Sequence, residues 1–201
     1  IRLFGKESFI FSIVHDFYNL KLAFVNYDMI DVFICHTEAF VKVFKSSATD
    51  YPRIDFLPHG VKVGRLSESV ENDKPLKLLF IGRLVESKGV QFLYDIDQKL
   101  KERDIKVEWI IIGGGVLEEQ LLDQWKDVGN VNFIKPKDND ETIRIAKGCD
   151  IFVSPSIFEG YGIALLEAMS CGNVPLVYQL PVGIASMLPS IAGFSIVDRN
   201  I

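Results

Sequence analysis

Short apolar runs alternate with amphipathic stretches from Lys77 almost to the end of the chain. The runs are brief and often β-branched, and polar or glycine residues follow them. This pattern is typical of strands buried on both faces of a parallel sheet. It predicts strands at Leu78–Ile81, Val107–Ile112, Val131–Ile134, Ile151–Val153, Val174–Val177 and Phe194–Val197.

Helical patterns fill the intervals between these runs. In the first interval, apolar residues such as Phe92, Ile96 and Leu100 recur at helical spacing among charged residues. The alternation of strand and helix favours right-handed βαβ units, and therefore a doubly wound, Rossmann-like α/β domain with helices on both faces. Helices are predicted at Gly89–Arg103, Leu117–Asp127, Asn139–Lys147 and Ile163–Cys171.

The first sixty residues hold too few elements for an independent domain. They are expected to be the remnant (1–60) of an upstream α/β lobe, joined to the Rossmann-like domain (61–201). The polar stretch Ser67–Pro75 reads as a loop. Strands are predicted at Phe9–Val14, Ile30–Cys35 and Ile54–Leu57, with a helix at Glu38–Lys45 capped by Thr37.

The composition of the chain limits the classes of function that it can have. The chain has 201 residues, of which 48% are hydrophobic, and a net charge of −5. It therefore has the composition of a packed globular protein, without the basic stripe that nucleic-acid binding requires. An acidic domain that binds an anionic nucleotide must do so through a few aimed groups. The three cysteines, Cys35, Cys149 and Cys171, are expected to be buried free thiols. No apolar run is long enough to span a membrane. Both observations favour a cytoplasmic location.

Ligands of open α/β sheets bind beyond the carboxyl ends of the strands. After the strand at Leu78–Ile81, Gly82 and Arg83 precede Lys88 and Gly89. An arginine and a lysine at the start of a helix can hold phosphate oxygens, although both could equally be solvated loop charges. The glycines at 113–115 are a weaker signal, because they do not have the spacing of a dinucleotide-binding turn.

The segment from Ser154 to Met169 carries the strongest signal. Glu159 lies in a glycine-rich turn ahead of a helix that starts at Gly162 or Ile163, and Glu167 lies about a turn inside that helix. A carboxylate in an apolar helix needs a partner, and a ribose diol would supply one. The free backbone N–H groups of Gly162 and Ile163 would face a diphosphate. In the alternative interpretation, Glu159 is an exposed turn residue and Glu167 forms an ordinary ion pair with a nearby lysine.

The two glutamates eight residues apart, with Glu-Gly-Tyr-Gly between them, resemble the paired-glutamate motif of retaining GT-B glycosyltransferases of family 4 (glycosyl transferases group 1). Gly82-Arg83 and Lys88-Gly89 resemble the donor-phosphate signature of that family. Residues 149–156 resemble its strand before the turn, and residues 57–61 its interdomain connector.

The resemblance implies a GT-B fold whose donor-binding C-terminal domain makes up most of this chain, with a partial acceptor-side lobe before it. Arg83, Lys88, Gly162 and Ile163 would hold the donor diphosphate. Glu159 would bind the transferred sugar and Glu167 the ribose. No cofactor and no metal are expected, because these cations and the helix end would take the charge. His15, at the end of a strand, is similar to the histidine that lines the donor sugar in this family, whereas His36 and His59 read as connector and surface residues.

Departures from the family pattern are also present. The segment Ile134–Lys137 stands where a glycine is frequent, so the grip on the base is undetermined. The glycine loop lacks a frequent acidic residue, and the early strands of the upstream lobe and a closing helix are expected to be missing.

Three functions are compatible with these residues. The first is a hexosyltransferase-like enzyme of the kind used in polysaccharide biosynthesis, which takes a nucleotide-diphospho-sugar donor and an unknown sugar, lipid or polysaccharide acceptor. Contact with a membrane surface stays open. The second is a non-catalytic nucleotide-sugar-binding module that serves a true transferase. The third is another GT-B enzyme such as a sugar-nucleotide epimerase.

Overall fold

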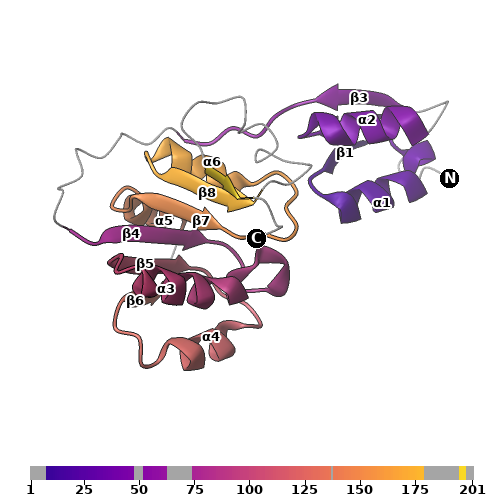
Figure 1. The fold of residues 1–201 in the computed structure, drawn as a ribbon. Helices are drawn as coiled ribbons and strands as arrows, with labels where there is room; N and C mark the ends of the chain where they lie inside the picture. Colours follow the sequence, from indigo (N-terminus) through magenta and orange to yellow (C-terminus); the bar gives the residue numbers. More distant parts are fainter. Residues whose placement is uncertain (1–7, 48–51, 63–73, 137, 179–194, 198–201) are drawn as a thin grey trace.

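The computed structural model describes residues 8–47, 52–62, 74–136, 138–178 and 195–197. These residues form two parallel sheets, one of three strands near the N-terminus and one of six strands (Figure 1). The elements of the small lobe are β1 (Phe11–Val14), α1 (Phe17–Val25), a 3₁₀ turn (Tyr27–Met29), β2 (Val32–Cys35), α2 (Glu38–Ser47) and β3 (Arg53–Phe56).

The large sheet is built from strands and helices that alternate along the chain. Its elements are β4 (Leu76–Ile81), the 3₁₀ turns η2 (Glu86–Lys88) and η3 (Val90–Phe92), α3 (Leu93–Glu102), β5 (Val107–Ile112), α4 (Glu118–Trp125), β6 (Val131–Ile134), α5 (Asn139–Ala146), β7 (Ile151–Ser154), α6 (Ile163–Ser170), β8 (Val174–Tyr178) and β9 (Ser195–Val197).

The strand order of the large sheet is β6-β5-β4-β7-β8-β9, and neighbouring strands pair in parallel. The chain builds outward from β4 to β6, then returns to add β7 on the other side of β4. The order thus reverses between β4 and β7, and this is where doubly wound sheets bind ligands. The predicted α/β class with parallel sheets is confirmed.

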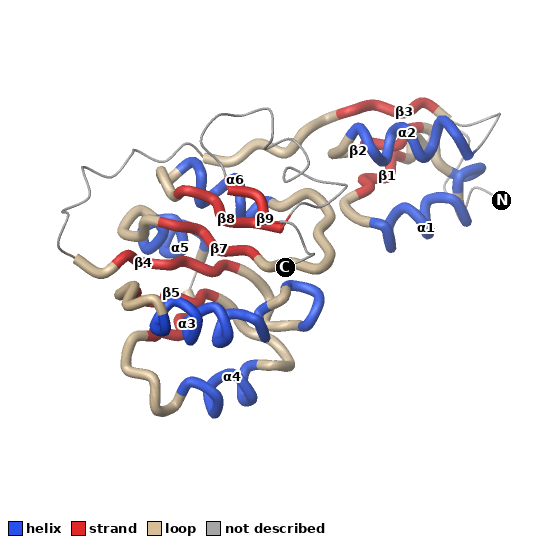
Figure 2. The backbone as a smooth tube through the Cα atoms, in the orientation of Figure 1, coloured by secondary structure: helices blue, strands red, loops and turns tan. Residues whose placement is uncertain are grey.

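Helices cover both faces of the large sheet because successive strand residues point in opposite directions. Leu79 and Ile110 pack with α5 and α6, whereas Leu78 and Trp109 pack with α3 and α4. Figure 2 shows α3 and α4 on one side of the strands and α5 and α6 on the other. Strands that are buried on both faces explain why their sequences read as continuous apolar runs.

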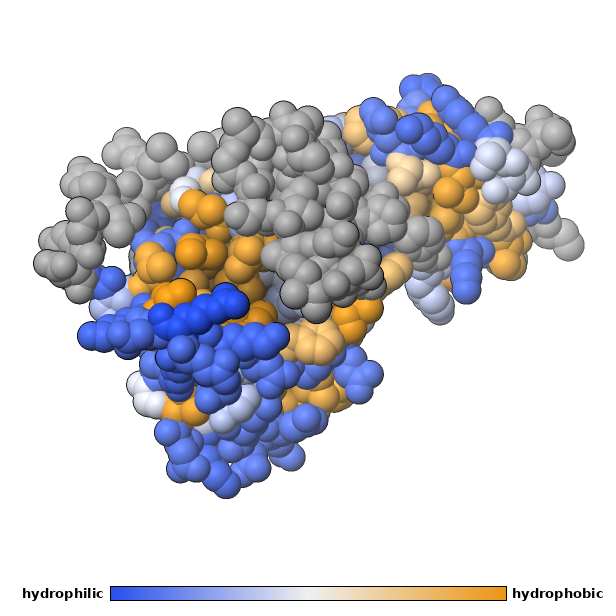
Figure 3. All heavy atoms as spheres, viewed as in Figure 1, coloured by the Kyte–Doolittle hydropathy of each residue, from blue (hydrophilic) through white to orange (hydrophobic). Residues whose placement is uncertain are grey.

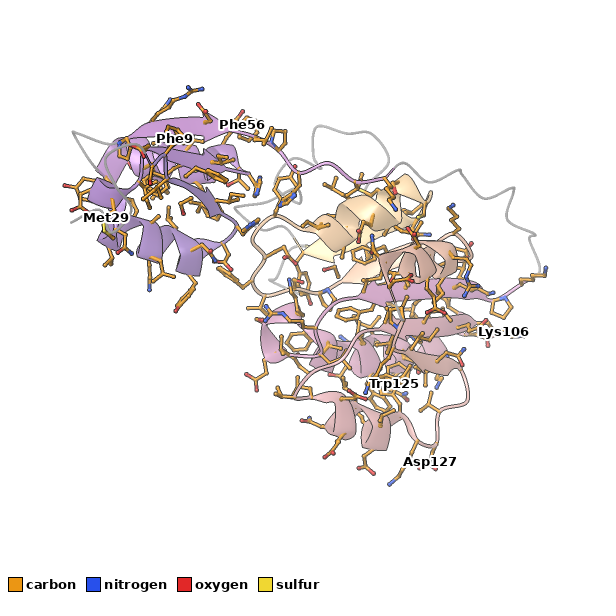
Figure 4. The ribbon with its side chains drawn as sticks, turned by 180° about the vertical axis from the view of Figure 1, so that it is seen from behind. Phe9, Met29, Phe56, Lys106, Trp125 and Asp127 are labelled. Carbon is orange, nitrogen blue, oxygen red and sulfur yellow. The ribbon has the colours of Figure 1, made fainter. Side chains whose placement is uncertain are left out.

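Two tryptophans anchor the face under α4. Trp125 lies edge-on to Trp109 with ring centroids 5.9 Å apart, and Asp127 lies just beyond the end of α4 (Figure 4). Asp97 is fully buried beside them and accepts hydrogen bonds from the Trp109 indole and the Asn130 amide, both at 3.0 Å. A buried carboxylate with several donors is stabilised, so this group holds α3 to β5.

The small lobe also contains a parallel sheet, but more of its apolar side chains are exposed. Phe11 of β1 pairs with Val32 of β2, which pairs with Arg53 of β3. Hydrophobic residues reach its surface in Figure 3, and the exposed large apolar side chains include Phe9, Phe11, Tyr18, Leu22, Val25, Met29, Phe56 and Leu57. Phe9, Met29 and Phe56 are labelled on this lobe in Figure 4.

The structure adds one helix that the hydrophobic pattern did not predict. Helix α1 begins after Asp16, whose Oδ1 accepts the backbone N–H of Asn19 at 2.8 Å. The predicted cap of α2 is present, since Thr37 Oγ1 accepts the N–H of Phe40 at 3.2 Å. Asp16 was thus the signal that could have revealed α1. The predicted loop Ser67–Pro75 lies mostly outside the described residues, as does Lys137.

The three cysteines are free and buried, as expected. Burial raises the pKa of Cys35 and of Cys149 to about 11, so both thiols are protonated at neutral pH. No helix among the described residues has the length and apolar character that crossing a membrane requires.

Candidate functional site

A pocket of about 300 Å³ lies at the carboxyl ends of β4 and β7, beside the small lobe. It occupies the point where the strand order reverses, which is the expected ligand position in a doubly wound sheet. Five residues singled out from the sequence line it together with Gly162: Arg83, Lys88, Glu159, Ile163 and His15. Glu167 is not among the lining residues.

Two loops from distant parts of the sequence form the floor of this pocket. The backbone carbonyl oxygen of Ser87 accepts hydrogen bonds from the backbone N–H groups of Ile157 and Phe158 at 3.0 and 3.1 Å. Gly89 has a left-handed φ of +67°, and a Cβ there would lie 1.9 Å from the carbonyl oxygen of Pro155. Only glycine permits this approach. The turn η2 is thereby held against the segment between β7 and α6.

This contact brings Lys88 and Glu159 into an ion pair. Lys88 Nζ lies 2.7 Å from both carboxylate oxygens of Glu159. The side chains are 18% and 22% exposed, so water screens the pair less than a surface pair. The two residues were assigned separate roles from the sequence, one toward phosphate and one toward sugar, and in the structure each is the partner of the other.

Helix α6 points its first turn at the same space. Ile163, Ala164 and Leu165 line the pocket, and their N–H groups precede the first intrahelical bond, which Leu166 donates to Gly162. Such N–H groups form a natural anion site. Arg83 lines the pocket and is exposed, and no hydrogen bond or ion pair within the described part of the chain holds its guanidinium.

Glu167 is half-buried on α6, where its Oε1 accepts the side-chain amide of Asn139 at 2.9 Å. Its partner is the first residue of α5 and not a lysine. Glu167 lies four residues after Ile163, so both occupy one face of the helix. The structure therefore places Glu167 further along the helix from its N-terminal end, outside the pocket itself.

The small lobe supplies the opposite wall. His15 and Asp16, just beyond β1, line the pocket together with His59 of the connector. His36 is buried at the end of β2, which corrects its interpretation as a surface residue. His59 is half-buried, and burial together with the nearby His36 and His15 lowers its pKa.

Asp16 carries a negative charge next to His15. Burial acts to raise the pKa of Asp16, but the hydrogen bonds from Asn19 outweigh it and the pKa lies below its usual value. Asp16 thus keeps its charge at the pocket mouth. Sequence reasoning missed Asp16, His59, Ser156 and Tyr161 as lining residues, although the first three closely follow predicted strands and Tyr161 lies in the turn that carries Glu159.

The glycine loop after β5 has a packing role. A Cβ at Gly113 would lie 1.9 Å from the carbonyl oxygen of Gly82, and Leu84 donates its N–H to Gly114. This loop therefore fixes the position of the loop that carries Arg83. None of its glycines is among the lining residues of the pocket.

The fold is that of GT-B glycosyltransferases. The structure superposes on TarM of S. aureus, solved with fondaparinux, α-GlcNAc-glycerol and UDP, with a TM-score of 0.81 at 18% identity over 97% of this chain and 42% of that one. It superposes on the pneumococcal O-GlcNAc transferase GtfA, solved with UDP and GlcNAc, with a TM-score of 0.71 at 20% identity over 88% of this chain and 38% of that one.

The chain belongs to the family of glycosyl transferases group 1, whose model matches residues 66–199. It is 26% identical over 167 residues to the GtfA subunit of the UDP-N-acetylglucosamine–peptide N-acetylglucosaminyltransferase of Streptococcus gordonii, covering 81% of this chain and 32% of that protein. It is 29% identical over 137 residues to the putative colanic acid biosynthesis glycosyltransferase WcaL of Escherichia coli, covering 63% of this chain and 33% of that protein. The chain thus spans about a third of the length of these relatives.

Proposed function

We propose that this chain forms the donor site of a glycosyltransferase that moves a sugar from a nucleotide-diphospho-sugar to an acceptor with retention of configuration. The observation that carries the proposal is the convergence of Lys88, Arg83 and the first turn of α6 on one pocket. Fixed positive groups at that point would stabilise the departing nucleoside diphosphate, which is the main catalytic requirement of the reaction.

Each donor part has a position in this proposal. The diphosphate lies between Lys88 and the N–H groups of Gly162 and Ile163, with Arg83 closing on it from the exposed side. The nucleoside extends along α6, where the ribose hydroxyls reach Glu167 on the same helix face as Ile163. The carboxylate of Glu167 then exchanges its bond with Asn139 for bonds to the diol.

The transferred sugar lies between Glu159 and His15, because these side chains line the pocket from the two opposite walls. In the structure, Glu159 accepts a hydrogen bond from Lys88. An ammonium group has three donors, so Lys88 can bind a phosphate oxygen while it keeps one bond to Glu159. The binding of the donor anion requires no metal in this scheme. The acceptor, drawn from sugars, lipids or polysaccharides, approaches from the small-lobe side.

Nucleoside diphosphate binding tests the proposal. UDP, GDP and ADP are titrated into the protein by calorimetry, with wild-type Lys88 and with Lys88→Met. We expect one of the three to bind, and the substitution to weaken that binding about 10–100-fold, because a charge-assisted hydrogen bond is lost.

The matched control is Lys126→Met. Lys126 directly follows α4, forms an exposed ion pair with Asp123 and is not among the residues that line the pocket. Lys126→Met should leave the affinity for the nucleoside diphosphate unchanged. No heat with any nucleotide from a folded protein, or equal affinity in the Lys88→Met variant, would overturn the donor-site assignment.

A further inference from the structure

All three histidines of the chain meet at one point. The ring centroids of His36 and His59 are 3.8 Å apart, those of His15 and His36 4.8 Å, and those of His15 and His59 5.5 Å. One ring nitrogen from each lies within 4.8 Å of the other two. None of the three imidazoles belongs to the apolar core cluster of the small lobe.

The topology of the small lobe explains how they meet. His15 directly follows β1, His36 directly follows β2, and His59 lies shortly after β3. Because the three strands are parallel, their carboxyl ends reach the same edge of the sheet. Each histidine is thus delivered by a separate strand to a shared position.

The hydrogen bonds of His36 leave one nitrogen free for a ligand. His36 Nδ1 lies 2.6 Å from the carbonyl oxygen of Leu57, to which it donates. Nε2 is then the acceptor, and it is buried with no hydrogen-bond partner among the described residues. A histidine that donates one N–H to a backbone carbonyl and presents its other nitrogen is the usual arrangement of a metal ligand.

The spacing of the other two nitrogens also suits a metal ion. His59 Nε2 and His15 Nδ1 lie 3.4 Å apart. Two nitrogens at about 2.0–2.1 Å from a tetrahedral zinc ion are separated by roughly 3.3–3.4 Å. The pair therefore already has the spacing that coordination requires, and the metal would replace the proton that the two rings share.

We propose that His15, His36 and His59 form a binding site for a divalent transition-metal ion such as Zn²⁺, with a fourth position left to water or a pocket ligand. Imidazole nitrogen is a preferred ligand of Zn²⁺ and its neighbours in the transition series. The ion would tie the connector at His59 to the carboxyl edge of the small sheet. It would not hold the donor diphosphate, which the proposed function assigns to Lys88 and α6.

Zn²⁺ alone, titrated into chelator-treated protein by calorimetry, tests this site. We expect one ion per chain, visible absorption of tetrahedral type when Co²⁺ is used instead, and a higher Tm with Zn²⁺. His59→Gln should weaken Zn²⁺ binding at least about 100-fold, since loss of a group that only hydrogen-bonds to a metal ligand already costs about 10–100-fold. The same is expected of His36→Gln, whose folding is checked by circular dichroism because His36 is buried.

Cys149→Ser is the matched control, because it removes another potential metal ligand that lies in the core of the large domain. It should bind Zn²⁺ like the wild type. Folded wild-type protein that takes up no Zn²⁺, or equal affinity in folded His59→Gln, would overturn the site. No nucleotide is present in this assay, so its failure leaves the donor-site proposal intact.

Discussion

The two walls of the pocket differ in how they are held. The large-sheet wall carries Lys88 and Glu159, which pair with each other on loops joined by backbone hydrogen bonds at Ser87. The small-lobe wall carries His15 and His59, and it meets the other wall through contacts such as the Tyr161 hydroxyl, 3.5 Å from the carbonyl of His59.

This difference indicates that the two walls have separate functions. The groups that we propose to bind the donor anion all lie on loops and on helix α6 of the large domain, and none comes from the small lobe. The imidazoles reach the pocket only while the small lobe stays in place. Nucleotide affinity should therefore depend on the large-sheet wall alone, and sugar transfer on both walls.

The largest effect is expected from Glu159→Gln in the full-length protein. Sugar transfer should fall at least about 100-fold, because a charged group next to the reacting sugar is lost. Nucleoside diphosphate affinity should rise roughly 3–10-fold, because Lys88 loses its competing carboxylate and a partly screened pair is worth about 1 kcal/mol. Rates are measured by product formation and affinities by calorimetry. An unaltered transfer rate would remove Glu159 from its role.

Gly160→Ala tests the contact between the walls. A Cβ at Gly160 would lie 2.4 Å from the carbonyl oxygen of His15 and 3.3 Å from the Cβ of Asp16. The small lobe must shift, and a displacement of about 1 Å can cost about 100-fold in rate. We expect transfer to fall about 10–100-fold while nucleotide affinity stays within about twofold.

Gly129→Ala is the control for this change, since a Cβ there meets open space. Its transfer rate and its Tm should match those of the wild type. If Gly160→Ala weakens nucleotide binding as much as transfer, the two walls do not act separately.

His15→Ala removes a side chain of the small-lobe wall without a steric clash. We expect transfer to fall about tenfold or more through loss of a sugar contact, with nucleotide affinity unchanged. Measuring both in one protein preparation checks the separation. A parallel loss of nucleotide affinity would place His15 against the diphosphate instead of the sugar.

The smallest effect is expected from Glu167→Gln, which lies outside the pocket lining. Affinity for the nucleoside diphosphate should fall about 3–10-fold, because a charge-assisted bond to ribose weakens. Affinity for inorganic pyrophosphate, which has no ribose, should not change, whereas Lys88→Met should weaken both. Equal losses for the two ligands in Glu167→Gln would contradict its assignment to the ribose.

Much of the large domain could be predicted from its sequence, because its central strands β4, β5 and β7 are mostly buried and helices α3, α4 and α5 have a polar side. Helix α1 could not, since Phe17–Val25 is apolar almost throughout and only Asp16 marks its start. The pairing of Lys88 with Glu159 joins residues 71 apart in the chain. It depends on the contact of Gly89 with Pro155, which no local pattern reports.

The histidine cluster could be predicted from the sequence only in part. His15, His36 and His59 each follow a predicted strand, so a parallel small sheet would have implied that they meet. The order and direction of those three strands were not predicted. Without them, His36 and His59 resembled ordinary connector and surface residues.

A crystal structure of the protein with the nucleoside diphosphate that binds in the titration tests the central claim most directly. We predict phosphate oxygens within hydrogen-bonding distance of Lys88 Nζ and of the N–H groups at the start of α6, with the ribose directed toward Glu167. A nucleotide bound elsewhere, with the space between Arg83, Lys88 and Glu159 empty, would contradict the account.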